Sequence, residues 1–143
     1  MRADTGRAMS QENVEALQRG IEAFNRRDVE GFLGELDAEV EFHAAIPRML
    51  GGEVAVYWGH EAVRELLLDL DSTLAGLHIV LAEIKDLGER IVGLGHFRVR
   101  GKASGAEVES PYGVVVDFKH GKAIRVRDYL DHREALEAAG PLA

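Results

Sequence analysis

Four ionisable residues of the chain could together carry acid–base chemistry, namely His43, His96, Arg98 and Asp128. Asp128 alternates with apolar residues, and a carboxylate in such surroundings is costly to bury unless it is paired. A histidine partner would make a base and its orienting group. An Arg98 partner would instead lower the pKa of the carboxyl and keep it ionised. Three roles stay open for Asp128: catalysis, ligand contact and a structural ion pair between strands.

Strand alternation predicts where these groups point. Alternate residues of a strand share a face, so Asp128 points inward if the apolar residues Val126 and Leu130 do. Apolar walls with a few convergent polar groups are the usual composition of a small-molecule site. The predicted cup is lined by His43, Ala45, His96, Arg98, Tyr112, Val114, Val126 and Asp128.

Trp58, the only tryptophan, is a further candidate for the ligand site. It either closes the pocket or packs under the loop at residues 51–52, and the sequence favours neither reading. His43, His96 and Asp128 could in principle form a metal site of two histidines and one carboxylate, but only their residue types support it. We therefore expect no metal.

The composition excludes several classes of protein. There is no cysteine, so disulfides, thiolate metal sites, cysteine nucleophiles and iron–sulfur clusters are ruled out. The sequence contains no G-x-S-x-G, P-loop, G-x-G-x-x-G or H-E-x-x-H motif. We expect no cofactor, and any chemistry then falls to Asp, His, Arg and Tyr side chains.

Length and charge bound the organisation of the chain. Its 143 residues fit one domain, and its formal net charge of −8 disfavours binding to nucleic-acid phosphates. No apolar run approaches the ~18 residues of a membrane span, and the N-terminus is not a secretory signal. We expect residues 1–9 to be a disordered tail, residues 10–143 to be a single domain, and the location to be cytoplasmic, without a membrane partner.

The elements that must position the candidate residues follow from hydrophobic periodicity. Ser10 is a good N-cap, and Asp28 another. Early helices followed by long strands joined by hairpins predict an α+β domain, in which a mainly antiparallel sheet curves around the N-terminal helices. Helices are predicted at about 11–26, 29–37, 60–75 and 132–139, and strands at 39–46, 77–87, 90–102, 105–119 and 122–131.

Several short motifs carry a family resemblance across residues 10–140. They are Glu12-Asn13-Val14 with Ala23-Phe24-Asn25, the stretch 59–64 (GHEAVR), Gly121-Lys122 and the stretch 127–131 (RDYLD). With this order of elements, the chain resembles the nuclear transport factor 2-like superfamily, and within it the SnoaL-like domain proteins, relatives of polyketide cyclases. The resemblance implies a cone-shaped, cystatin-like α+β barrel with a pocket at its open end. It does not by itself imply one function, since this superfamily includes enzymes and binding domains.

Two relatives within the superfamily sharpen the comparison. The stretch 127–142 resembles limonene-1,2-epoxide hydrolase, but of that family's five catalytic residue types only Asp128 is kept here. Epoxide hydrolysis is therefore the less favoured activity. Ketosteroid isomerase uses a tyrosine as a hydrogen-bond donor in its oxyanion hole. In the present sequence, Tyr112 is the one tyrosine that could plausibly take that role.

These residues predict a cofactor-free acid–base enzyme of the cyclase or isomerase kind, acting on a small apolar molecule. Asp128 would accept the proton, and Arg98 would stabilise developing negative charge. His43 or His96 would donate a proton or position the substrate. The alternatives are a binding module that uses the same cup without chemistry and an interaction protein that uses the outer sheet face. The resemblance also implies a homodimer through that face, on which Arg125, Arg127 and Tyr129 are expected.

Overall fold

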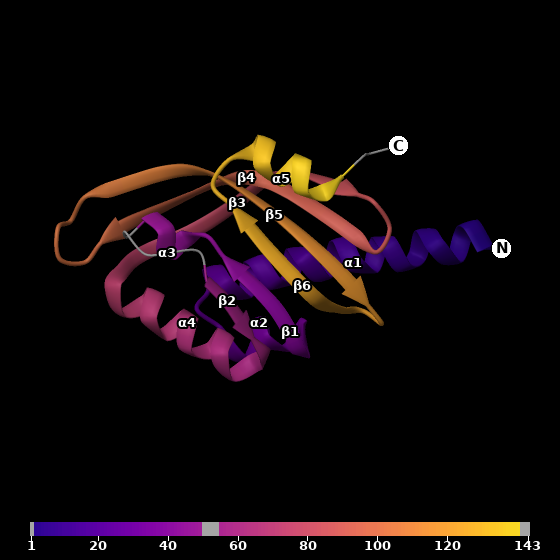
Figure 1. The fold of residues 1–143 in the computed structure, drawn as a ribbon, viewed down its shortest axis with the longest axis horizontal. Helices are drawn as coiled ribbons and strands as arrows, with labels where there is room; N and C mark the ends of the chain where they lie inside the picture. Colours follow the sequence, from indigo (N-terminus) through magenta and orange to yellow (C-terminus); the bar gives the residue numbers. More distant parts are fainter. Residues whose placement is uncertain (1, 50–54, 141–143) are drawn as a thin grey trace.

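The computed structural model describes residues 2–49 and 55–140 (Figure 1). One mixed sheet of six strands has the order β2-β1-β6-β5-β4-β3. The helices are α1 (Arg2–Asn25), α2 (Val29–Gly34), α3 (Ile46–Met49), α4 (Gly59–Thr73) and α5 (His132–Ala139). The strands are β1 (Leu36–Ala44), β2 (Ala55–Trp58), β3 (Leu74–Asp86), β4 (Arg90–Gly101), β5 (Glu107–Lys119) and β6 (Lys122–Tyr129).

The sheet is mainly antiparallel, as predicted, and only β1 and β6 run parallel to each other. The helices α1, α2 and α4 pack against its inner face around the larger hydrophobic core (Figure 1). The helix α5 crosses β4 and β5 on the outer face, over a smaller core that includes Val92 and Val115. The central part of the sheet is therefore buried on both faces, whereas β1 and β2 are covered on one.

Local sequence signals explain most element boundaries. The side chain of Asp28 caps α2 by accepting a hydrogen bond from the backbone amide of Gly31 at 2.9 Å, as predicted. His120 and Gly121 both have positive φ, which is the backbone geometry of a tight hairpin turn, and they join β5 to β6. The predicted C-terminal helix at 132–139 is confirmed.

Two predictions at the N-terminal end are wrong. The helix α1 begins at Arg2 rather than near residue 11, so Ser10 lies inside the helix and residues 2–9 belong to it. Arginine, alanine and methionine predominate there, and these residues favour continuation of a helix. The strand β1 begins at Leu36 rather than at residue 39, because α2 ends at Gly34.

The segment between β1 and α4 contains elements that the sequence did not indicate. Pro47 lies in the first turn of α3, a position where its missing amide hydrogen costs no helical hydrogen bond. The strand β2 then pairs with β1 at the edge of the sheet. The predicted loop at residues 51–52 lies outside the described residues. Within the described part of the chain, no helix has both the length and the apolar character needed to span a membrane.

Candidate functional site

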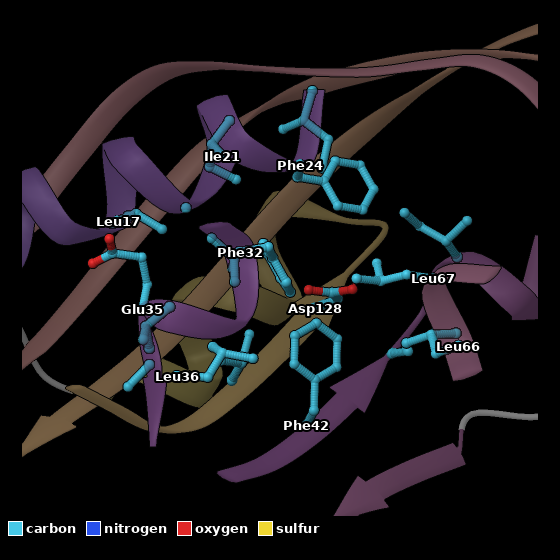
Figure 2. A pocket seen from close by; sticks show the side chains of 18 of the residues that line it. Leu17, Ile21, Phe24, Phe32, Glu35, Leu36, Phe42, Leu66, Leu67 and Asp128 are labelled. Atoms are coloured by element: carbon cyan, nitrogen blue, oxygen red, sulfur yellow. The ribbon is translucent and has the colours of Figure 1, made fainter. Parts of the chain in front are cut away.

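A cavity lies between the inner face of the sheet and the helices α1, α2 and α4 (Figure 2). The centre of a water-sized sphere can move through about 60 Å³ of it. Its walls are almost entirely apolar and include the rings of Phe24, Phe32 and Phe42. The apolar stripes of α1 and α4 form one wall, and residues of both helices belong to the larger hydrophobic core as well.

The strand β5 supplies the back wall as predicted. Tyr112, Val114, Val116 and Phe118 are all buried and all line the cavity, which confirms that they share the inner face. In the neighbouring strand β6, Val126 and Asp128 also line it. The register pairs Val114 with Asp128, so the carboxylate stands in a row of apolar side chains.

Asp128 is held by two neutral donors. The hydroxyl of Tyr112 donates a hydrogen bond to Oδ1 at 2.9 Å, and the backbone amide of Ala45 donates another. Burial raises the pKa of Asp128 to about 7, against the opposing effect of these two hydrogen bonds. Near neutral pH this group can therefore both accept and release a proton.

Tyr112 is fixed between Asp128 and the core. Its ring packs edge-on against Phe97, with ring centroids 6.1 Å apart. Burial, followed by the nearby negative charge of Asp128 and the hydrogen bond to it, raises the pKa of Tyr112 well above its usual value. Its hydroxyl therefore stays protonated and keeps donating to the carboxylate.

A second carboxylate, Glu35, borders the cavity and was not predicted. It lies between α2 and β1, beside Leu17 and directed away from Asp128 (Figure 2). Arg19 binds it with two hydrogen bonds of 3.0 and 3.1 Å, and these raise the pKa of the arginine. No periodic signal marks Glu35, since it is the C-terminal capping residue of α2.

His43 and Ala45 do not face the cavity, so their predicted orientation is wrong. Phe42 and Ala44 line it instead, and His43 lies on the outer face with its Nε2 atom 2.5 Å from Oε2 of Glu41. A shift of one residue in a strand inverts every facing assignment. Ala45 reaches the site only through its backbone amide.

His96 and Arg98 also lie on the outer face, contrary to the prediction. They share one face, as expected, but Phe97 and Val99 occupy the inner one. Arg98 is exposed, and His96 lies 3.7 Å from Glu109. Of the alternative partners considered for Asp128, Arg98 is therefore excluded.

The physical reason for this error lies at the start of β4. Val92 and Leu94 are buried beneath α5 on the outer face, so both parities of the strand carry apolar residues there. Gly95 occupies an inner position where a Cβ atom would lie 1.8 Å from the carbonyl oxygen of Val80. Only glycine fits at this position. The sequence therefore lacks the apolar residue that would have identified the inner face of β4.

The remaining candidates divide between the two sides of the sheet. Trp58 is 64% exposed at the end of β2 and does not line the cavity. His43 and His96 do not line the cavity that Asp128 lines. Across residues 2–49 and 55–140, no group of three or more His, Asp or Glu side chains could hold a metal ion.

A curved sheet wrapped around helices, with an apolar cavity between them, defines the cone-shaped α+β class of nuclear transport factor 2-like proteins. The model of the SnoaL-like domain family matches residues 17–126, and the chain belongs to this family. A search of curated proteins finds no significant match.

Solved structures support this assignment. An NTF2-like protein of unknown function from Burkholderia pseudomallei K96243 is 26% identical, with a TM-score of 0.77 over 91% of this chain and 98% of that one. TerC, co-crystallised with polyporic acid, is 25% identical, with a TM-score of 0.75 over 91% and 99%. A candidate polyketide cyclase from Xanthomonas campestris pv. campestris is 21% identical, with a TM-score of 0.69 over 91% and 98%.

Proposed function

We propose that the cavity binds a small, mainly apolar organic molecule and that Asp128 transfers a proton to or from it without a cofactor. The observation that carries this proposal is the position of Asp128. Its carboxyl group lies in an apolar cavity and receives hydrogen bonds from Tyr112 and the Ala45 amide. An ionisable group of perturbed pKa in such a cavity is a candidate for chemistry.

The pKa of about 7 suits this role. A general base works best when its pKa lies near the working pH, since it is then ionised often enough and still holds the proton it removes. Tyr112 would orient the carboxylate and would strengthen its hydrogen bond as negative charge returns to Asp128. The functions predicted for His43, His96 and Arg98 are not proposed again, because these side chains lie on the outer face.

The comparison with TerC supports the binding part of the proposal. A chain of 25% identity and the same fold was crystallised with an organic compound, polyporic acid. The apolar walls described above would likewise accommodate a mainly apolar organic skeleton. Membership of the SnoaL-like family is compatible with a cyclase or isomerase activity, and equally with binding alone.

The base can be tested without the natural substrate, by using nitrobenzisoxazole as a probe. Removal of its carbon-bound proton breaks the ring N–O bond and releases a coloured nitrile phenolate, with the proton left on the base. We expect turnover that rises with pH through about 7, as Asp128 ionises. Asp128→Asn should lower it by about 100-fold or more, the usual contribution of a general base.

The matched control is Glu41→Gln, which removes a carboxylate from the outer face of the same sheet. It should leave turnover within about twofold, since Glu41 does not touch the cavity. Full activity in Asp128→Asn would contradict the proposal. Saturable binding of the probe, with turnover no faster than that of free carboxylate in solution, would instead support a binding module.

A further inference from the structure

The charges around the cavity are of one sign. Among the lining residues that the structure describes, Asp128 and Glu35 are the acids, and no lysine, arginine or histidine accompanies them. Glu35 is already neutralised by its two hydrogen bonds from Arg19. The carboxylate of Asp128 therefore remains as the one charge on the described walls without a cationic partner.

Aromatic rings add to this electrostatic bias. Phe32 lies between Phe24 and Phe42, with ring centroids 5.8 Å and 6.1 Å away, and all three rings line the cavity. The Asp128 carboxylate is directed into the space that Phe32 and Phe42 border (Figure 2). Ring faces carry partial negative charge and attract cations, more strongly where water is excluded.

Hydrogen-bond donors that could hold an anion are scarce. The hydroxyl of Tyr112 already donates to Asp128, and so does the Ala45 amide. An anionic ligand would place a second negative charge beside Asp128 in apolar surroundings, where like charges repel strongly. A carbonyl substrate that became an oxyanion would likewise find little stabilisation on these walls.

We propose that the natural ligand is a hydrophobic amine that enters as its ammonium ion and pairs with the Asp128 carboxylate among the Phe24, Phe32 and Phe42 rings. This inference rests on the proposed function, and it names the substrate class of the same site. The ammonium supplies the opposite charge that the cavity lacks, and the apolar skeleton fills the remaining space.

The same pairing explains what proton transfer would achieve there. When the nitrogen-bound proton moves to the carboxylate, the N–H bond breaks and the O–H bond forms. The products are a free amine and a carboxylic acid, both neutral. An apolar cavity favours neutral species over separated charges, so it assists this direction of transfer. The free amine then carries the lone pair needed for a following step.

The charge preference of the cavity can be measured with three probes of similar size that differ in charge. They are benzylamine, benzyl alcohol and benzoate. At about pH 8, Asp128 is mostly ionised and benzylamine is still protonated. Isothermal titration calorimetry should show benzylamine binding about tenfold more tightly than benzyl alcohol, since an opposite charge shifts such a carboxyl by at least one pKa unit. Benzoate should bind more weakly than both.

Variants assign the preference to Asp128. Asp128→Asn should abolish the advantage of benzylamine while keeping the affinity for benzyl alcohol within about twofold. Glu41→Gln removes the same charge from the outer face and should keep the full advantage. Circular dichroism and thermal unfolding of each variant show that a lost advantage does not result from a lost fold.

Equal affinities for benzylamine and benzyl alcohol, or tighter binding of benzoate, would overturn the amine proposal. Proton abstraction from nitrobenzisoxazole by Asp128 would then still stand as the function of the site. An amine advantage that persists in Asp128→Asn would also overturn the pairing. If neither benzylamine nor benzyl alcohol binds, the amine proposal fails, and the nitrobenzisoxazole assay decides separately whether Asp128 acts as a base.

Discussion

On the inner face of the sheet, Asp128 accepts hydrogen bonds from a tyrosine hydroxyl and a backbone amide, in an apolar cavity. On the outer face, Glu41 lies against His43 and Arg125, with its Oε2 atom 2.5 Å and 2.8 Å from their nitrogens. The pKa of Asp128 is raised by burial, whereas the pKa of Glu41 is lowered, mainly by the hydrogen bond from His43 and also by Arg125.

This difference shows that the environment, rather than the residue type, decides what a carboxylate can do. The strands β1 and β6 pair directly. Glu41 of β1 points to the outer face of the sheet, whereas Asp128 of β6 points to the inner face. On the charged outer side, a carboxylate is stabilised as an anion and serves as an ion-pair partner. On the apolar inner side, it is available for proton transfer near neutral pH.

The largest effect should come from the contrast between adjacent residues of β4. Phe97→Ala removes a fully buried ring that packs on Tyr112, and should lower the free energy of unfolding by about 3–5 kcal/mol. Arg98→Ala, on the exposed outer side, should change it by less than about 0.5 kcal/mol. Urea denaturation measures both. Similar losses in the two variants would contradict the assignment of faces.

Asp128→Asn should change how stability depends on pH. The folded-state pKa of about 7 lies above the ordinary value of 3.8, so the ionised carboxylate opposes folding. Wild-type stability should therefore fall as pH rises from about 4 through about 7, and this slope should be absent in the variant. A three-unit shift corresponds to at most about 4 kcal/mol, and we expect about 2 kcal/mol because the cavity is open to water.

Denaturation at about pH 5 and pH 8 isolates this contribution. The stability of Asp128→Asn relative to the wild type should be higher at the alkaline value. Parallel profiles for the two proteins would show that the carboxylate is not desolvated.

Glu41→Gln should have a smaller effect of opposite sign. Because the pKa of Glu41 is lowered on folding, its ion pairs stabilise the protein above the ordinary carboxyl pKa, and this contribution is lost as pH falls through the folded-state value. The loss in Glu41→Gln at neutral pH should be at most about 1 kcal/mol, since solvent screens the pair. Raising the salt concentration should reduce this loss of stability further. A loss that does not change with salt concentration would contradict a screened ion pair.

The exposed outer face is also where we propose that a second copy of the chain packs. Trp58 and Val56, 64% and 41% exposed, lie beside a row in which Glu41, Arg125 and Asp117 alternate in charge. Such a row can pair with itself when two copies meet by a twofold rotation. Trp58→Glu should convert a dimer into monomers with little change in monomer stability. Analytical ultracentrifugation that finds the same mass for both proteins would contradict this interface.

The smallest effect should follow His96→Ala. This histidine was a candidate catalytic residue, but it is about half exposed on the outer face, near Glu109. Turnover of nitrobenzisoxazole should stay within about twofold of the wild type. A large loss would mean that the outer face takes part in the chemistry.

The accuracy of the sequence-based assignments differed from strand to strand. In β5, the residues at 112, 114, 116 and 118 were correctly assigned to the inner face, although Val115 is buried beneath α5 on the outer face. In β4, α5 buries Val92 and Leu94 on the outer face, so alternation alone could not identify the inner one. In β1, the assignment placed His43 rather than Phe42 inward, although Phe42 is the apolar residue.

The order of the elements, most of their boundaries, the resemblance to the SnoaL-like family and the inward position of Asp128 were all readable from local patterns. These patterns depend on neighbours within a few residues, and the chain alone carries them. The partners of Asp128 were decided by the tertiary structure. Tyr112, Ala45 and the apolar rings come from distant segments, and only their convergence desolvates the carboxylate and raises its pKa.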